Sequence, residues 1–204
     1  GRGMTPRRRS GRFALRAAGW RRGAWGTVAA GVLVSTALAP AVGQVDHAGG
    51  YHVARRVVLG GNGGWDYLTV DPVARRVYVA RDTHVQVLDA DRDSIVHDIV
   101  GTEGVHGIAL APGFGRGFTS DGRDATVTIF DLHTYGVIGR VLVTGRDPDA
   151  IVYDSVSRRV FTMNGGSDNA TAIDAASGAE AGTIALGGRP EFAVADGRGR
   201  VYVN

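Results

Sequence analysis

Short apolar runs separated by turn-forming residues fill the chain from residue 67 onward. The first group predicts four strands, at Tyr67–Asp71, Arg76–Ala80, Val85–Asp89 and Ile95–Val100. Their lengths, their content of Val, Ile and Tyr, and the partial alternation of apolar and polar positions are typical of β-strands. Asp-Pro, Ser-Asp-Gly and Asn-Gly-Gly sequences between the runs favour turns. No stretch after residue 43 has the period of a long amphipathic helix, so the pattern predicts an all-β protein.

This group of strands recurs at a step of about forty residues, which is typical of propeller blades. LTVDPVARRVYVA (68–80), IALAPGFGRGFTS (108–120) and IVYDSVSRRVFTM (151–163) superpose, and AVADGRGRVYVN (193–204) begins a fourth copy. VQVLD, VTIFD and ATAID, which end at Asp89, Asp131 and Asp174, keep the same step. Four antiparallel strands at this period predict a β-propeller. We expect a closing strand at 52–59, blade one at 67–100, blade two at 107–144, blade three at 150–186 and a partial blade four at 192–204.

Several segments resemble a known repeat family. VYVA, GFTS, VFTM-N and VYVN lie where the YVTN β-propeller repeat family carries its tetrapeptide, although Gly117–Ser120 departs from that pattern. GGWDYLTVDPVARRVYVARDTHVQVLD, GVHGIALAP and RPEFAVADG resemble the exported bacterial YncE-like proteins of this family. The resemblance covers residues 51–204 and implies a ring of roughly seven blades. With about three and a half blades, the sequence resembles the N-terminal part of such a protein, and we expect its exposed strand edges to associate.

The composition mainly shows where the charged residues lie along the chain. All 23 basic residues are Arg, and eight of them precede residue 44, where there is no acidic residue. An apolar run from Ala24 to Ala39 and small residues before Gln44 follow, which predicts a secretory signal peptide at 1–43. This run is shorter than the roughly 20 residues of a membrane-spanning helix, although an uncleaved anchor is the alternative. We expect a periplasmic or secreted chain (44–204) with no membrane span after signal removal.

The remainder of the chain has 15 Arg against 20 acidic residues, a net charge of −5. This balance argues against a nucleic-acid partner, because such proteins present basic surfaces. There is no Cys, which excludes disulfides and thiolate metal sites. Sequence signatures of a nucleophile elbow, a zinc-protease helix and a phosphate-binding loop are also absent from the chain.

One ionisable residue recurs in the loop that leads into the first strand of each blade. These residues are Asp66, His106, Asp149 and Glu191. Because the first strand of a blade lines the central channel, we expect the four side chains to form a rim at the channel mouth. Such a rim suits a cationic ligand or a divalent transition metal, or it simply solvates the channel and terminates turns. Trp65, beside Asp66, either stacks on a ligand or covers the first blade.

Three functions follow from these features. The first is an exported binding scaffold, with no catalytic residues, that recognises a protein or small ligand through Trp65 and the rim. The second is a metal-dependent propeller enzyme, a lactonase-like hydrolase or a redox protein, with the rim as its metal site; it rests on analogy of fold. The third is DNA binding, which the resemblance to YncE-like proteins implies and the acidic charge opposes.

Overall fold

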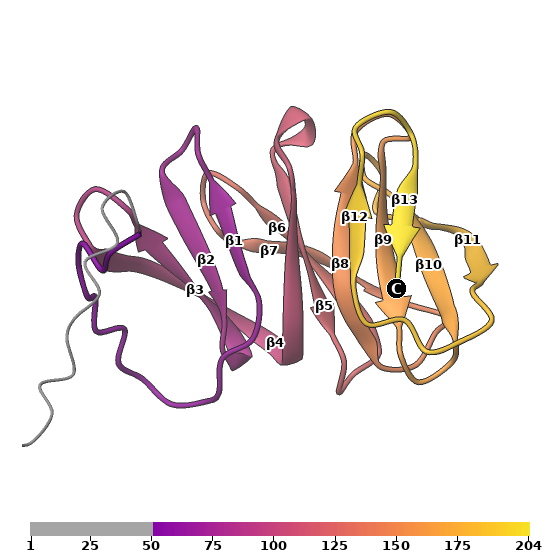
Figure 1. Ribbon diagram of the computed structural model, residues 1–204, viewed down its shortest axis with the longest axis horizontal. Coiled ribbons are helices and arrows are strands. Elements are labelled where there is room, and N and C mark those ends of the chain that lie inside the picture. The colour runs from indigo at the N-terminus through magenta and orange to yellow at the C-terminus, as the bar shows by residue number, and fades with distance from the viewer. Residues whose placement is uncertain (1–50) are drawn as a thin grey trace, which may run out of the picture. The chain divides into compact units, whose positions relative to one another are not determined.

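The strands expected from the repeat form in the computed structural model, which describes residues 51–204 (Figure 1). Thirteen strands and one short 3₁₀ helix occur in this range, and every pairing between them is antiparallel. The predicted signal peptide lies outside the described residues. Within them, the all-β class expected from the sequence is confirmed.

Blade one is a run of neighbouring strands whose order in the sheet follows the order in the chain. The strands are β1 (Leu68–Asp71), β2 (Arg76–Ala80), β3 (Asp82–Asp89) and the first part of β4 (Ser94–Ala111). The amide of Asp66 donates to the carbonyl of Ala80, and Ala80 donates to Tyr67, so pairing extends past the start of β1. Residues 52–59, expected as a closing strand, belong to no strand of the described chain.

β4 differs from the sequence prediction, which placed two separate strands here. It runs through 18 residues, closing blade one and opening blade two. Gly101 and Gly104 have φ of 77° and 69°, values that glycine adopts without the steric cost of a side chain. Val105 pairs with Asp82, so the link between the blades is itself hydrogen-bonded as a strand. The connection is therefore extended rather than a loop.

Blades two and three complete the regular part of the fold. After β4, blade two contains the 3₁₀ helix Pro112–Phe114 and strands β5 (Arg116–Asp121), β6 (Thr126–Asp131) and β7 (Val137–Leu142). Blade three contains β8 (Pro148–Asp154), β9 (Arg159–Asn164), β10 (Asn169–Asp174) and β11 (Glu180–Ala185). A two-stranded partial blade four follows, with β12 (Ala193–Ala195) and β13 (Val201–Val203).

Recurrent aspartates build the turns at the strand ends. The carboxylate of Asp71 accepts the backbone N–H groups of the second and third residues after it, and Asp154 does the same. Asp89, Asp131 and Asp174 repeat this arrangement after the third strand of each blade. The donated N–H groups hold the pKa of these three carboxyls below the usual value. These carboxylates form the turns, and one oxygen of each accepts two backbone N–H groups.

Three hydrophobic cores lie between successive blades. One joins blades one and two through Tyr78 and Ile108, and the next joins blades two and three through Phe118 and Ile151. The third joins blade three to the partial blade, where Met163 and Ala193 meet. The apolar side chains are therefore buried where neighbouring blades pack face to face. The first strands of successive blades lie beside one another.

Candidate binding site at the channel mouth

The first strands of the four blades enclose a cavity of about 210 Å³, which we call the channel pocket. Its walls are Tyr67, Leu68 and Thr69 from blade one, Gly107 and Ile108 from blade two, Ala150 and Ile151 from blade three, and Phe192 and Ala193 from blade four. Two hydroxyls fix the spacing of these strands. Thr69 Oγ1 donates to the Ile108 carbonyl at 2.7 Å, while Ser120 Oγ accepts the Gly107 amide at 2.9 Å and donates to the Asp149 carbonyl.

Each rim residue predicted from the sequence immediately precedes a residue that lines this pocket. Asp66, His106, Asp149 and Glu191 therefore share one end of the four first strands. The tyrosine hydroxyl of Tyr67 reaches the carbonyl of Glu191 at 3.2 Å, which links blade one to blade four. The four residues named from the repeat are thus brought to the same mouth.

The closest contact within this group joins a histidine to an aspartate. His106 Nδ1 lies 2.8 Å from Asp66 Oδ2, and both side chains are partly exposed. Because a carboxylate only accepts hydrogen bonds, the proton of a neutral imidazole sits on Nδ1 and leaves Nε2 as an acceptor. A Cβ on Gly122 would lie 2.8 Å from His106 Nε2 and 3.0 Å from Asp147 Oδ1. The absence of a side chain at Gly122 therefore leaves room between these two acceptors.

Three of the four rim residues are carboxylates. Burial raises the pKa of Asp149; the nearby His106 lowers it, and the carboxylates of Asp66 and Glu191 raise it. Burial also raises the pKa of the Tyr67 phenol, with Asp149 as the next largest cause. Burial is the largest cause of both shifts, and the neighbouring carboxylates add to it. A bound cation would lower the pKa of Asp149 by favouring its charged form.

A metal site is not formed by this group as it stands. Within residues 51–204, no three His, Asp or Glu side chains lie close enough together to share one metal ion. Only His106 and Asp66 are in direct contact. The metal site predicted at Asp66, His106, Asp149 and Glu191 therefore stays a prediction.

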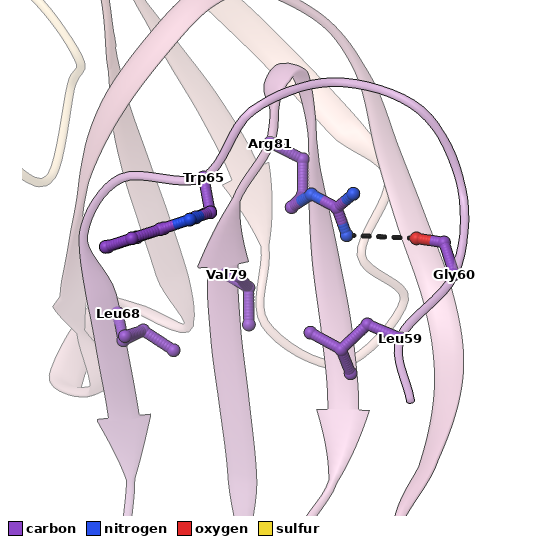
Figure 2. A pocket seen from close by; sticks show the side chains of 6 residues that line it. All are labelled: Leu59, Gly60, Trp65, Leu68, Val79 and Arg81. Atoms are coloured by element: carbon purple, nitrogen blue, oxygen red, sulfur yellow. Dashed lines mark hydrogen bonds between the residues drawn. The ribbon is translucent and has the colours of Figure 1, made fainter. Parts of the chain in front are cut away.

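Trp65 lies in a different cavity from the rest of the predicted site. Trp65 is 80% exposed among the described residues. Together with Leu59, Leu68 and Val79 it lines a second, mostly apolar cavity of about 340 Å³ on blade one (Figure 2). Whether Trp65 stacks on a ligand or covers the first blade stays a prediction.

Two aromatic residues of the channel pocket were missed from the sequence. The rings of Tyr67 and Phe192 stack with centroids 6.1 Å apart and an interplanar angle of 18°. Each directly follows a rim residue, and that position is the signal that identifies them. Their rings give the pocket an aromatic wall below the carboxylates.

Comparisons with known proteins bear on the fold. No protein-family model and no curated protein sequence matches the chain. Among solved structures, the chain is similar to the WD40 β-propeller domain of Doa1, with 12% identity and a TM-score of 0.61 over 71% of this chain and 48% of that one. It is also similar to Kuenenia stuttgartiensis hydrazine synthase (15% identity, TM-score 0.61, 71% of this chain and 42% of that chain). A third similar structure is Saccharomyces cerevisiae Sqt1 (11% identity, TM-score 0.53, 60% and 36%).

The chain spans less than half the length of these solved chains. No helix within residues 51–204 is long and apolar enough to cross a membrane. At such low identity the likeness concerns the fold alone. Together with the antiparallel four-stranded blades, it shows that this chain is an all-β protein of the β-propeller type.

Proposed function

We propose that this chain is an exported β-propeller scaffold of the YVTN type, and that it binds a positively charged small ligand or protein segment at the channel mouth. The observation that carries the proposal is the gathering of Asp66, Asp149 and Glu191 above a pocket with an aromatic wall. Propellers commonly serve as binding scaffolds, and the likeness to the WD40 propeller of Doa1 is consistent with that use.

The charges at the mouth favour a cation. Glu191 has a partner in Arg189, whose Nε lies 3.0 Å from Glu191 Oε1, but both side chains are largely exposed and such pairs are weak. Asp149 is half-buried and carries a raised pKa, which a nearby positive charge would bring down. Tyr67 and Phe192 add aromatic surface of the kind that attracts ammonium groups.

The test compares three probes of one shape and different charge. Butylammonium, butanol and butyrate are titrated into the full chain by isothermal calorimetry at low ionic strength. We expect butylammonium to bind, butanol to bind more weakly, and butyrate to be rejected. Binding should weaken as salt rises, because partly exposed charges are screened, and as the pH falls and Asp149 takes up a proton.

Single variants locate the site. Asp149→Asn should weaken butylammonium binding by about tenfold, which corresponds to about 1.4 kcal/mol. Asp98→Asn removes one carboxylate from the exposed outer part of β4 and should leave binding unchanged. Equal binding of butanol and butylammonium, or equal loss in the two variants, would contradict recognition of charge at the mouth.

Export is tested separately from binding. Expression of the full chain in a bacterial host, followed by mass measurement of the exported form, should give a product that begins at Gln44. A product retained with residues 1–43 would contradict the proposed signal.

A further inference from the structure

Two hydrogen-bond acceptors from blades two and three meet beside Gly122, in the turn between β5 and β6. An atom at the Cβ position of Gly122 would lie 2.8 Å from His106 Nε2 and 3.0 Å from Asp147 Oδ1. Both values fall within the usual range for an N–H donor and its acceptor. A donor lodged in this gap, which we call the Gly122 notch, can therefore reach both acceptors.

The imidazole of His106 is oriented for this task by its other nitrogen. Asp66 Oδ2 lies 2.8 Å from His106 Nδ1, so the neutral ring donates its proton to the carboxylate. The lone pair of Nε2 is then left on the side of the notch. Asp66 thus acts as a positioning residue, and His106 presents an acceptor rather than a donor to an incoming group.

Asp147 occupies a backbone position that the repeat fills with glycine in blade two. Its φ is 55°, and the equivalent Gly104 has a φ of 69°. Glycine adopts such values freely, whereas a side chain adds a steric cost. Asp147 is exposed and is one of the carboxylates that raise the pKa of Asp149. The carboxylate therefore belongs to the channel mouth, and the turn itself would accept a residue without it.

The charge of Asp147 is not matched by a cation of its own. Among residues 51–204 it forms no ion pair. Arg123, next to Gly122, pairs instead with Glu103 and Asp82 at 2.9 and 3.0 Å. Arg146 directs its guanidinium to a backbone carbonyl of the hairpin between β9 and β10. The notch thus combines a negative charge with two acceptors.

We propose that the Gly122 notch binds a primary ammonium group, which donates one N–H to His106 Nε2 and another to Asp147 Oδ1. This inference rests on the proposed recognition of a cation and specifies which kind of cation is preferred. Carboxylate charge and aromatic rings attract primary and quaternary ammonium groups alike. Only the primary group has several N–H donors, so two acceptors on either side of one gap select it.

The test compares two cations that differ in their donors. Butylammonium and butyltrimethylammonium are titrated into the full chain by isothermal calorimetry at low ionic strength. We expect butylammonium to bind about tenfold or more tightly than butyltrimethylammonium, because hydrogen bonds to charged groups are lost in the latter. Equal affinities would overturn the inference, while a preference for butylammonium over butanol would still support recognition of charge. Failure of both cations to bind would overturn both proposals.

An isosteric variant separates the hydrogen bonds from the size of the two cations. Asp147→Asn keeps the volume of the side chain, and asparagine tolerates the left-handed backbone. It should weaken butylammonium binding by about tenfold and butyltrimethylammonium binding by much less. Asp147→Gly, which copies blade two, should weaken butylammonium binding at least as much. Far-UV circular dichroism checks that both variants keep the strand content of the wild type.

Asp168→Asn is the matched control. Asp168 is also exposed, has a φ of 54°, and lies in the hairpin between β9 and β10. Its replacement removes the same charge from a similar backbone and should leave the ratio of the two affinities unchanged. A ratio that survives both Asp147 variants, or that falls equally in Asp168→Asn, would overturn the assignment to the notch.

A primary ammonium can come from a free amine or from a lysine side chain of a protein. Lysine that is acetylated at its amino group and amidated at its carboxyl group is therefore titrated in parallel. Tighter binding than butylammonium assigns the ammonium to a protein segment, and weaker binding assigns it to a small amine. Rejection of both compounds overturns the inference.

Discussion

Asp121 is a buried carboxylate that forms no ion pair with any residue of the described range 51–204, and its replacement tests how this fold tolerates charge. It ends β5, is 1% exposed, and accepts hydroxyl hydrogen bonds from Thr119 at 2.8 Å and Thr128 at 2.6 Å. Thr126 adds a longer bond at 3.3 Å. Arg140 is near, but its guanidinium donates to Thr128 Oγ1 and to a backbone carbonyl. Burial outweighs these donors and raises the pKa of Asp121 to about 6.

The direction of the shift fixes the sign of its effect on stability. A folded-state pKa of about 6, against an ordinary value of 3.8, means that the folded protein binds more protons than the unfolded chain between these values. Stability therefore falls as the pH rises through that window, and the full loss is present above it. The difference of about two pKa units corresponds to about 3 kcal/mol. Asp121→Asn should remove this loss.

Blade three carries an asparagine at the position equivalent to Asp121. Asn164 occupies the equivalent position, accepts a hydrogen bond from Thr162 at 2.9 Å and donates to Thr171 Oγ1 at 2.9 Å. An amide at position 121 would accept from Thr119 and donate to Thr128 in the same manner. We therefore expect Asp121→Asn to increase the free energy of unfolding by about 2–3 kcal/mol near pH 7. The gain should shrink toward zero as the pH falls to about 4.

Urea unfolding of the full chain, followed by circular dichroism at a series of pH values, measures this difference. The reciprocal Asn164→Asp variant is the matched control, and it should lose stability near neutral pH and recover it in acid. An Asp121→Asn protein that is less stable than the wild type at neutral pH would refute the reasoning. So would a stability difference that does not change with pH, because then the charge of the carboxylate would not be its cause.

Two glycine substitutions and one arginine substitution test packing and hydrogen bonds elsewhere in the chain. Gly117→Ala should destabilise the chain by about 1–3 kcal/mol in urea unfolding, because a Cβ there would overlap the ring of Phe130; unchanged stability would contradict this packing. Gly122→Ala should weaken butylammonium binding more than it lowers stability, since its Cβ would press on His106 Nε2; intact binding in calorimetry would count against that geometry. Arg81→Ala should speed hydrogen exchange at residues 60–64, which its guanidinium holds, and unchanged exchange would show that the loop is held by other contacts.

Most strands of the blades could be predicted from the sequence, because each repeat contains both the apolar run of a strand and the polar residues of the turn that follows it. Asp131 and Asp174, for example, end strands and accept the same backbone N–H groups, so local chemistry determines where these strands stop. β4 was not foreseen as one strand, because Gly101 and Gly104 suggest a break in a single sequence. They instead supply the positive φ that lets one strand pass from blade one to blade two. Where a strand between two blades begins and ends depends on its pairing with strands on either side, and a local sequence pattern does not show that pairing.

The rim could be located but its contacts could not. Alignment of the loops indicated that Asp66 and His106 share one end of the blades, yet their direct hydrogen bond depends on how closely blades one and two pack. The same holds for Tyr67, whose stacking on Phe192 joins blades that are distant in the chain.

One position of the repeat shows how a conserved geometry accepts different chemistry. Arg81 directly follows the second strand of blade one, and its equivalents Asp121 and Asn164 end the second strands of blades two and three. Each bonds to the side chain at the same place in the third strand, which is Gln86, Thr128 or Thr171. The tie between strands is thus kept while the charge changes from positive to negative to neutral. Only the arginine is long enough to continue outward, where it holds the loop that borders the cavity beside Trp65. A side-chain bond between the second and third strands thus recurs in the three blades, and in blade one the length of Arg81 lets it also hold the surface loop.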